Sequence, residues 1–150
     1  MSVWKPAVTV AAVIERDGRF LFVEEEADGR RVLNQPAGHL DPGESLLDAV
    51  TREVMEETAH PFKATALVGV YRWHYAPRDT TFLRFAFCGD AGDAEKGRVL
   101  DREILGLHWL TREEVAARRA MHRSPLVERS LADYLAGRRF PLDLLSREFA

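Results

Sequence analysis

The sequence predicts an α+β fold in which a mixed sheet is layered with helices. The patterns follow the order strands, helix, strands, then helices, which favours a layered domain over an all-helical or all-strand one. Apolar residues make up 46% and charged residues 30%, as in folded globular proteins. At 150 residues, without a repeat or a Ser/Gly linker, the chain is expected to form one domain over residues 1–150.

Charge and cysteine content narrow the classes of function. The net charge of −3 and the pI near 6.0 exclude broad attraction to nucleic-acid polymers, so an anionic partner must be met locally. The one cysteine, Cys88, lies in an apolar run and is expected to be a buried thiol in a reducing cytoplasm. The apolar run that ends before Glu15 is too short for a membrane helix. We expect a cytoplasmic monomer or homodimer without membrane contact.

The first 35 residues are expected to contain a hairpin and a short strand. Residues 7–14 are rich in Val, Thr and Ile, and they form the hairpin with residues 20–24, because Asp17-Gly18 between the two strands is typical of a tight turn. Residues 27–31 form a polar turn, and 32–35 a short strand before Pro36.

A helix is expected between Pro42 and Thr58. Ser45 can cap it, Asp48 closes a capping box, and Pro61 prevents its continuation. Apolar residues recur at helical spacing, namely Leu47, Val50 and Val54.

The second half predicts more strands and then helices. Residues 64–75 and 80–88 form a hairpin joined by 76–79, and an acidic loop follows at 89–97. Residues 104–110 form a last strand with Trp109 inward. Two helices are then expected. A capping box from Thr111 to Glu114 begins a short one, and Ser124 caps a second that has Pro125 at its first position and Gly137 at its end.

Three carboxylates converge on the predicted helix. Glu53, Glu56 and Glu57 are three and four residues apart, so at 100° per residue they share one face. Like charges at this spacing repel each other, so the array needs a cation. Hard oxygen ligands suit Mg²⁺, with Mn²⁺ as an alternative, and such an ion also neutralises a diphosphate.

The wider spacing around these carboxylates is specific. Gly38 is followed after five residues by Glu44, and after seven more by the run Arg52 to Glu57. This resembles the box of the Nudix hydrolases, G-x5-E-x7-R-E-U-x-E-E-x-G-U, where U is bulky and aliphatic. The resemblance implies an α/β/α sandwich with a mixed sheet and a loop-helix-loop catalytic motif. It also implies divalent metal and hydrolysis of small diphosphate-containing molecules.

The resemblance assigns roles by position. Glu53 and Glu57 match the main metal ligands, Glu56 joins them or supports their waters, and the Gly38 carbonyl is a further ligand.

Arg52 would hold the carboxylates in place, with Glu44 as its partner, because a guanidinium fork suits bidentate carboxylate contact. Ala59 and His60 depart from the box at its closing glycine and aliphatic residue, so we expect a different helix exit and intact ligands.

The general base in this family often lies outside the box, before a late strand. Glu103 occupies that neighbourhood and is the predicted base, with Glu24, Glu25 and Glu26 as alternatives. A surface carboxylate remains the other interpretation of Glu103.

Flanking segments indicate the substrate. Residues 33–40, 82–87, 123–127 and 137–142 resemble a phosphatase branch of the family. This implies stepwise release of phosphate from nucleoside tri- and diphosphates, thiamine pyrophosphate and hydroxymethylpyrimidine diphosphate. The alternatives are a pyrophosphatase of nucleotide sugars, dinucleotides or oxidised nucleotides, and a non-catalytic metabolite-binding module.

Substrate-contacting residues are expected on the aromatic strands. Arg84 either contacts phosphate or bridges a glutamate or aspartate, because a cation inside such a strand needs a partner. Gln35 or Asn34 is expected to bind the edge of a pyrimidine. Alternation sends about half of the aromatic residues inward, so stacking on a flat ring falls to some of Trp73, Tyr75, Phe82 and Phe85. His39, His74 and His108 lack the spacing of zinc ligands.

Overall fold

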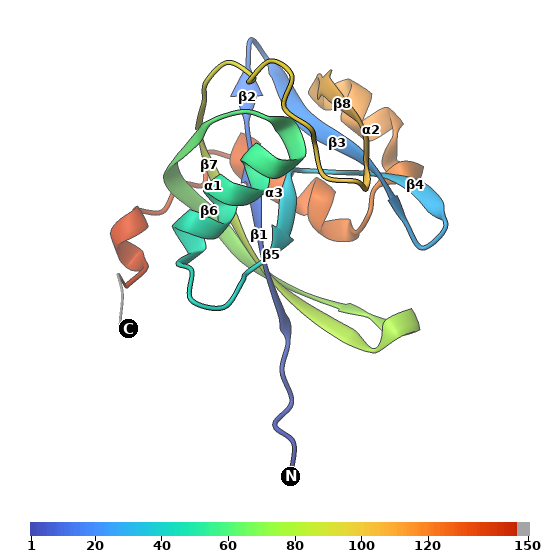
Figure 1. Ribbon diagram of the computed structural model, residues 1–150, viewed down its shortest axis with the longest axis vertical. Helices are drawn as coiled ribbons and strands as arrows, with labels where there is room; N and C mark the ends of the chain where they lie inside the picture. Colours follow the sequence, from blue (N-terminus) through green and yellow to red (C-terminus); the bar gives the residue numbers. More distant parts are fainter. Residues whose placement is uncertain (147–150) are drawn as a thin grey trace.

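The computed structural model describes residues 1–146 and contains two sheets and three α-helices (Figure 1). The strands are β1 (Ala7–Val13), β2 (Glu15–Arg16), β3 (Arg19–Ala27), β4 (Arg30–Asn34), β5 (Ala37–His39), β6 (Phe62–Tyr75), β7 (Thr80–Ala91) and β8 (Ile104–Leu110). The helices are α1 (Leu46–Thr58), α2 (Arg112–Ala117) and α3 (Pro125–Leu135), with short 3₁₀ turns η1 (Ala76–Arg78), η2 (Arg119–Met121) and η3 (Leu142–Leu144). No helix among these residues is long and apolar enough to cross a membrane.

The first sheet carries the layered architecture. Its order is β5-β1-β7-β6; β1 and β7 run parallel, and the other pairs are antiparallel, so the sheet is mixed. Val10 and Ala12 of β1 pack with Val50 and Val54 of α1. Val13, on the opposite face, packs in the cluster that contains residues of α3. Helices therefore cover both faces, which confirms the α+β sandwich.

The second sheet is built around β3, which pairs with β2, β4 and β8. Asp17 and Gly18 have φ angles of 52° and 75°, which confirms the tight turn before β3. The predicted pairing of 7–14 with 20–24 is wrong for β1 and holds only at the end of that range, where the Leu21 N–H donates to the Ile14 carbonyl at 3.0 Å beside the β2–β3 pair. β1 instead lies between β5 and β7, where a strand buried on both faces belongs.

Helix α1 begins as expected and ends differently. The Ser45 hydroxyl accepts a hydrogen bond from the Asp48 N–H at 3.1 Å. Among the described residues the Asp48 carboxylate accepts no bond from the Ser45 N–H, so the capping box is only half formed. At the other end Ala59 has φ 61° and its N–H donates to the Met55 carbonyl. The sequence predicts that the chain leaves the helix differently from a box that closes with glycine. That prediction is wrong, since Ala59 adopts the left-handed conformation that a glycine usually takes at this position.

Backbone contacts hold this exit in place. The Ala59 carbonyl accepts from the Glu95 N–H at 2.9 Å, and the His60 ring lies 2.8 Å from the Thr58 carbonyl. Ala59 is buried and has the smallest side chain after glycine, which keeps the cost of a positive φ angle to about 1 kcal/mol.

The later elements follow the sequence with small shifts. Strand β7 continues to Ala91, into the expected acidic loop, while β6, β8 and the short strand β4 are confirmed. The Thr111–Glu114 capping box is complete, and Ser124 caps α3. Trp109 is partly buried against the core beneath α1. The three-residue strand β5 was not predicted.

We expect Ala59→Val to lower the free energy of unfolding by about 2 kcal/mol, because a buried β-branched residue at positive φ adds backbone strain and steric crowding. Urea denaturation in EDTA measures this. Ala136→Val is the matched control, since Ala136 is exposed with φ −74°; an equal loss in both variants would contradict the strain argument.

Candidate active site

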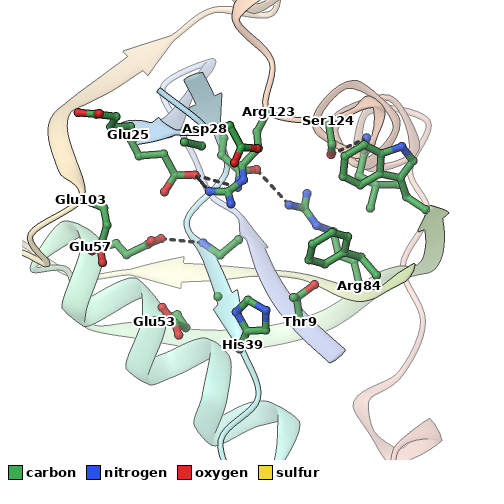
Figure 2. Close-up of a pocket in the computed structure, with 18 of the residues that line it drawn as sticks. Thr9, Glu25, Asp28, His39, Glu53, Glu57, Arg84, Glu103, Arg123 and Ser124 are labelled. Atoms are coloured by element: carbon green, nitrogen blue, oxygen red, sulfur yellow. Dashed lines mark hydrogen bonds and ion pairs between the residues drawn. The ribbon is translucent and has the colours of Figure 1, made fainter. Parts of the chain in front are cut away.

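A cavity of about 460 Å³ opens where α1, β5 and the β6–β7 hairpin meet the loops before β8 and α3 (Figure 2). Its walls differ in chemistry. Acidic residues line one part, including Glu53, Glu57, Asp101 and Glu103; aromatic and basic residues line another, including Trp73, Phe82, Arg84 and Arg123.

Arg52 organises the acidic part. It donates to Glu44 through Nε at 3.0 Å and Nη2 at 2.6 Å, and through Nη1 to Glu53 at 2.9 Å and Glu56 at 3.1 Å. It also donates to the His39 carbonyl of β5 at 3.0 Å. The Arg52 hydrogen bond holds the pKa of Glu44 below its usual value, and the glutamates raise the pKa of Arg52. One guanidinium thus positions two of the predicted ligands and Glu44.

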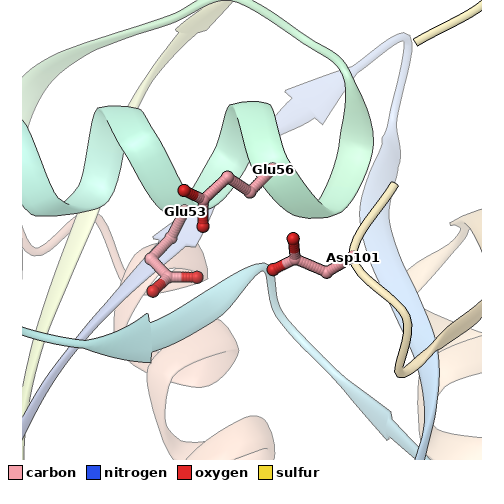
Figure 3. A group of neighbouring side chains, drawn as sticks. All are labelled: Glu53, Glu56 and Asp101. Carbon is pink, nitrogen blue, oxygen red and sulfur yellow. The ribbon is translucent and has the colours of Figure 1, made fainter. Parts of the chain in front are cut away.

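The candidate metal ligands form a cluster that includes an unpredicted residue. Carboxylate oxygens of Glu53, Glu56 and Asp101 lie within 4.8 Å of one another (Figure 3). The Asp101 N–H donates to the Glu56 carbonyl at 3.0 Å, so the loop before β8 is bound to the last turn of α1. Sequence reasoning took Glu103 from this loop and missed Asp101, although an acid two residues away was an available signal.

Glu57 belongs to the same cavity but faces β5. Its Oε1 accepts from the Ala37 N–H at 2.8 Å, and the residue is 6% exposed. Burial, followed by the charges of Glu25, Glu53 and Asp101, raises the pKa of Glu57 to about 9. Burial likewise raises the pKa of Glu53, against the opposing effect of Arg52. Arg52 is the cation that pairs with these carboxylates among the described residues, which leaves them in excess, and a hard divalent cation fits this set of oxygen donors.

Gly38 allows β5 to approach the helix. A Cβ atom at this position would lie 2.1 Å from the Glu53 carboxyl carbon, so any other residue here would displace the Glu53 carboxylate. The glycine thus brings the β5 backbone directly against the carboxylate cluster, which is where a carbonyl ligand would have to lie.

Glu103 lines the cavity from the loop before β8. It is exposed, and its carbonyl accepts from the Glu26 N–H at 3.3 Å, which holds the loop against β3. Of the alternative bases, Glu24 pairs with Arg31 and lies outside the cavity lining, whereas Glu25 is buried and accepts from Arg123 at 2.6 Å. Glu26 lines the cavity.

The aromatic wall consists of two of the four expected residues. The Trp73 and Phe82 rings stack with centroids 5.6 Å apart, and both line the cavity. Tyr75 contacts Trp73 and Phe85 packs against the core, but neither is part of the lining.

Arg84 and Gln35 lie beside this wall as a bonded pair. Arg84 is 5% exposed and donates to the Gln35 and Asn34 side-chain oxygens, each at 3.0 Å. Gln35 is 1% exposed, and its amide nitrogen donates to the Val127 carbonyl at 2.8 Å. Gln35 is therefore committed to protein groups on both sides. Within residues 1–146 Arg84 has no glutamate or aspartate partner, so the bridging alternative is wrong.

We expect the metal-free protein to lose stability as pH rises from 5.5 to 8.5. Glu57 has a pKa of about 9 when folded and near 4.5 when unfolded, so folding favours its protonated form and deprotonation above pH 4.5 opposes folding. One such group contributes a slope of up to about 1.4 kcal/mol per pH unit.

Urea denaturation in EDTA across this range tests the expectation. Glu57→Gln should flatten the profile, while Glu113→Gln, which removes an exposed carboxylate of α2, should leave it unchanged. Identical profiles for all three proteins would remove Glu57 as the source.

Comparison with known proteins agrees with this geometry. Residues 3–130 match the NUDIX domain. The chain is 38% identical over 142 residues to the phosphatase NudJ of Escherichia coli K12, covering 95% of this chain and 92% of NudJ. It superimposes on a NUDIX hydrolase from Nitrosomonas europaea with a TM-score of 0.94 and 50% identity, covering 96% and 98% of the two chains. A MutT protein from Methanosarcina mazei shares the fold, with a TM-score of 0.71, 23% identity and coverage of 92% and 100%.

The family match spans most of the chain and includes α1 together with the Asp101 and Glu103 loop. The chain therefore belongs to the NUDIX family, as a hydrolase acting on phosphorus-containing anhydrides.

Proposed function

We propose that this protein is a Mg²⁺-dependent phosphatase of nucleoside tri- and diphosphates, thiamine pyrophosphate and hydroxymethylpyrimidine diphosphate, formed by one domain over residues 1–150. The observation that carries the metal dependence is the meeting of Glu53 and Glu56 of α1 with Asp101 from a distant loop. The substrate class rests on the 38% identity to the phosphatase NudJ. The proposed partner is a small diphosphate, for a cytoplasmic monomer or homodimer that binds neither nucleic-acid polymers nor membranes.

Mg²⁺, or Mn²⁺ in its place, would be held by Glu53, Glu56 and Asp101, with Glu57 and the Gly38 carbonyl completing the set. When bound, the cation offsets the charge of the diphosphate, polarises the phosphorus and lowers the pKa of a water. Arg52 acts as a positioning residue, because its hydrogen bonds fix the oxygens of Glu53 and Glu56. Glu44 fixes Arg52 in turn.

Glu103 is the proposed general base. It lines the same cavity as the ligands and is exposed, so its carboxylate can reach an attacking water and accept its proton. The water attacks phosphorus in line with the leaving oxygen, and no covalent enzyme intermediate is needed.

The substrate's ring is proposed to stack on Trp73 and Phe82, which present a flat aromatic wall to the cavity. Arg84 is the proposed contact to phosphate. Gln35 holds Arg84 and does not reach the substrate, since both ends of its amide are already bonded.

A pyrophosphatase of nucleotide sugars, dinucleotides or oxidised nucleotides is the second enzymatic candidate, because the helix and its ligands suit any diphosphate. The third candidate is a binding module without turnover, which the complete carboxylate set argues against.

Product analysis with Mg²⁺ and with EDTA separates these candidates. We expect orthophosphate from thiamine pyrophosphate and nucleoside di- and triphosphates, and loss of turnover in EDTA. Pyrophosphate or paired monophosphates as products would favour the second candidate, and ligand-induced thermal stabilisation without turnover the third. Full activity in EDTA would contradict the metal role.

We expect Glu57→Gln and Asp101→Asn to reduce kcat at least about 100-fold, and Glu103→Gln by about 100- to 10,000-fold, while all three remain folded. Metal titration distinguishes the roles. Raising Mg²⁺ should partly restore Asp101→Asn but not Glu103→Gln, which keeps its metal affinity. Near-full activity of Glu103→Gln would show that its carboxylate is structural.

A further inference from the structure

Arg84 is a buried cation whose protein partners are neutral. Its guanidinium donates to the oxygens of Asn34 and Gln35, and no glutamate or aspartate lies within ion-pair distance among the described residues. Burial lowers the pKa of Arg84 to about 10, so it remains charged at neutral pH. A buried charge without a counter-ion destabilises the fold, so an anion that can reach it gains strong electrostatic attraction.

The buried Glu25 beside Asn34 already has a cationic partner. Glu25 is 5% exposed and accepts from Arg123 at 2.6 Å, with the Asn34 amide nitrogen 3.5 Å from the same oxygen. Asn34 therefore separates the Arg123–Glu25 ion pair from Arg84, and the pair leaves Arg84 without a carboxylate of its own.

The arrangement holds the guanidinium open to the cavity. The two bonds to Asn34 and Gln35 use two of its five N–H groups, and Gln35 is anchored to α3 through Val127. Figure 2 shows Arg84 directed into the space between the carboxylates and the start of α3. Ser124 and Leu126 at this helix end line the same cavity, where the helix dipole also favours an anion.

We infer that Arg84, held by Asn34 and Gln35 beside the start of α3, forms a metal-independent phosphate subsite for the substrate phosphoryl group that does not lie at the carboxylate cluster. This inference rests on the proposed function for the identity of the natural ligand. The subsite also has a consequence for the reaction, since free orthophosphate that occupies it blocks the substrate and is therefore a competitive inhibitor.

Binding of inorganic phosphate in EDTA tests the subsite directly. Phosphate at about 10 mM should raise the Tm of the wild-type protein, with ionic strength matched by chloride, because a ligand that binds the folded state stabilises it. Arg84→Met should weaken phosphate binding about tenfold or more. Arg72→Met is the matched control, since Arg72 is an exposed arginine of β6 outside the cavity lining, and it should bind phosphate as the wild type does.

Asn34→Asp keeps Arg84 and tests the phosphate subsite even if Arg84→Met does not fold. An aspartate here presents a carboxylate to Nη2 of Arg84, which should compete with phosphate and weaken its binding about tenfold. Absence of phosphate binding by the wild type, or unchanged binding by whichever of these two variants folds, would overturn the inference.

Kinetics separate this inference from the proposed function. With Mg²⁺, Arg84→Met should raise KM for a diphosphate and the inhibition constant of phosphate together. Phosphate binding that depends on Arg84 in a protein without turnover would support the subsite and refute the phosphatase. Metal-dependent turnover with unchanged phosphate inhibition in Arg84→Met would do the opposite.

Discussion

The hydrogen-bonded contact of Arg52 with its surrounding carboxylates is the interaction on which the site depends. Four carboxylates, those of Asp41, Glu44, Glu53 and Glu56, lie within 3.3 Å of its nitrogens. One positive charge cannot neutralise four negative charges, so Arg52 orders the cluster without removing its demand for a cation. The fixed fork of the guanidinium also explains why lysine would not serve here, because a point charge cannot hold separate oxygens at defined positions.

The backbone of β5 completes this arrangement from the opposite side. Its residues contact the helix at three successive positions: the Ala37 N–H binds Glu57, Gly38 leaves space for Glu53, and the His39 carbonyl accepts from Arg52. The same strand pairs with β1 at the centre of the domain. Helix α1 is thus attached to the sheet by polar contacts at the site and by apolar contacts of Val50 and Val54.

Local patterns predicted the parts of this structure that depend on neighbours in sequence. The helix, its carboxylate face and the caps at Ser45, Thr111 and Ser124 follow from spacings of two to four residues. Partners distant in sequence were not predictable in this way. β1 pairs with β7 more than 70 positions later, and Asp101 meets Glu53 through a loop that carries no ligand spacing. Ala59 shows another limit of sequence patterns, because tertiary contacts hold it at a positive φ angle that alanine disfavours.

The cavity combines two charge environments that a diphosphate would bridge. The carboxylate cluster attracts a phosphoryl group only through a cation, whereas Arg84 offers its charge without one. Arg84 and the carboxylate cluster line one cavity, so one phosphoryl group could be bound at Arg84 while the other reacts at the proposed metal ligands. The aromatic wall of Trp73 and Phe82 adds apolar surface without a fixed hydrogen-bond pattern, so the proposed stacking would accept many flat rings. Such a site would select tightly for the diphosphate and loosely for the ring, which is the selectivity that the proposed phosphatase of several diphosphates requires.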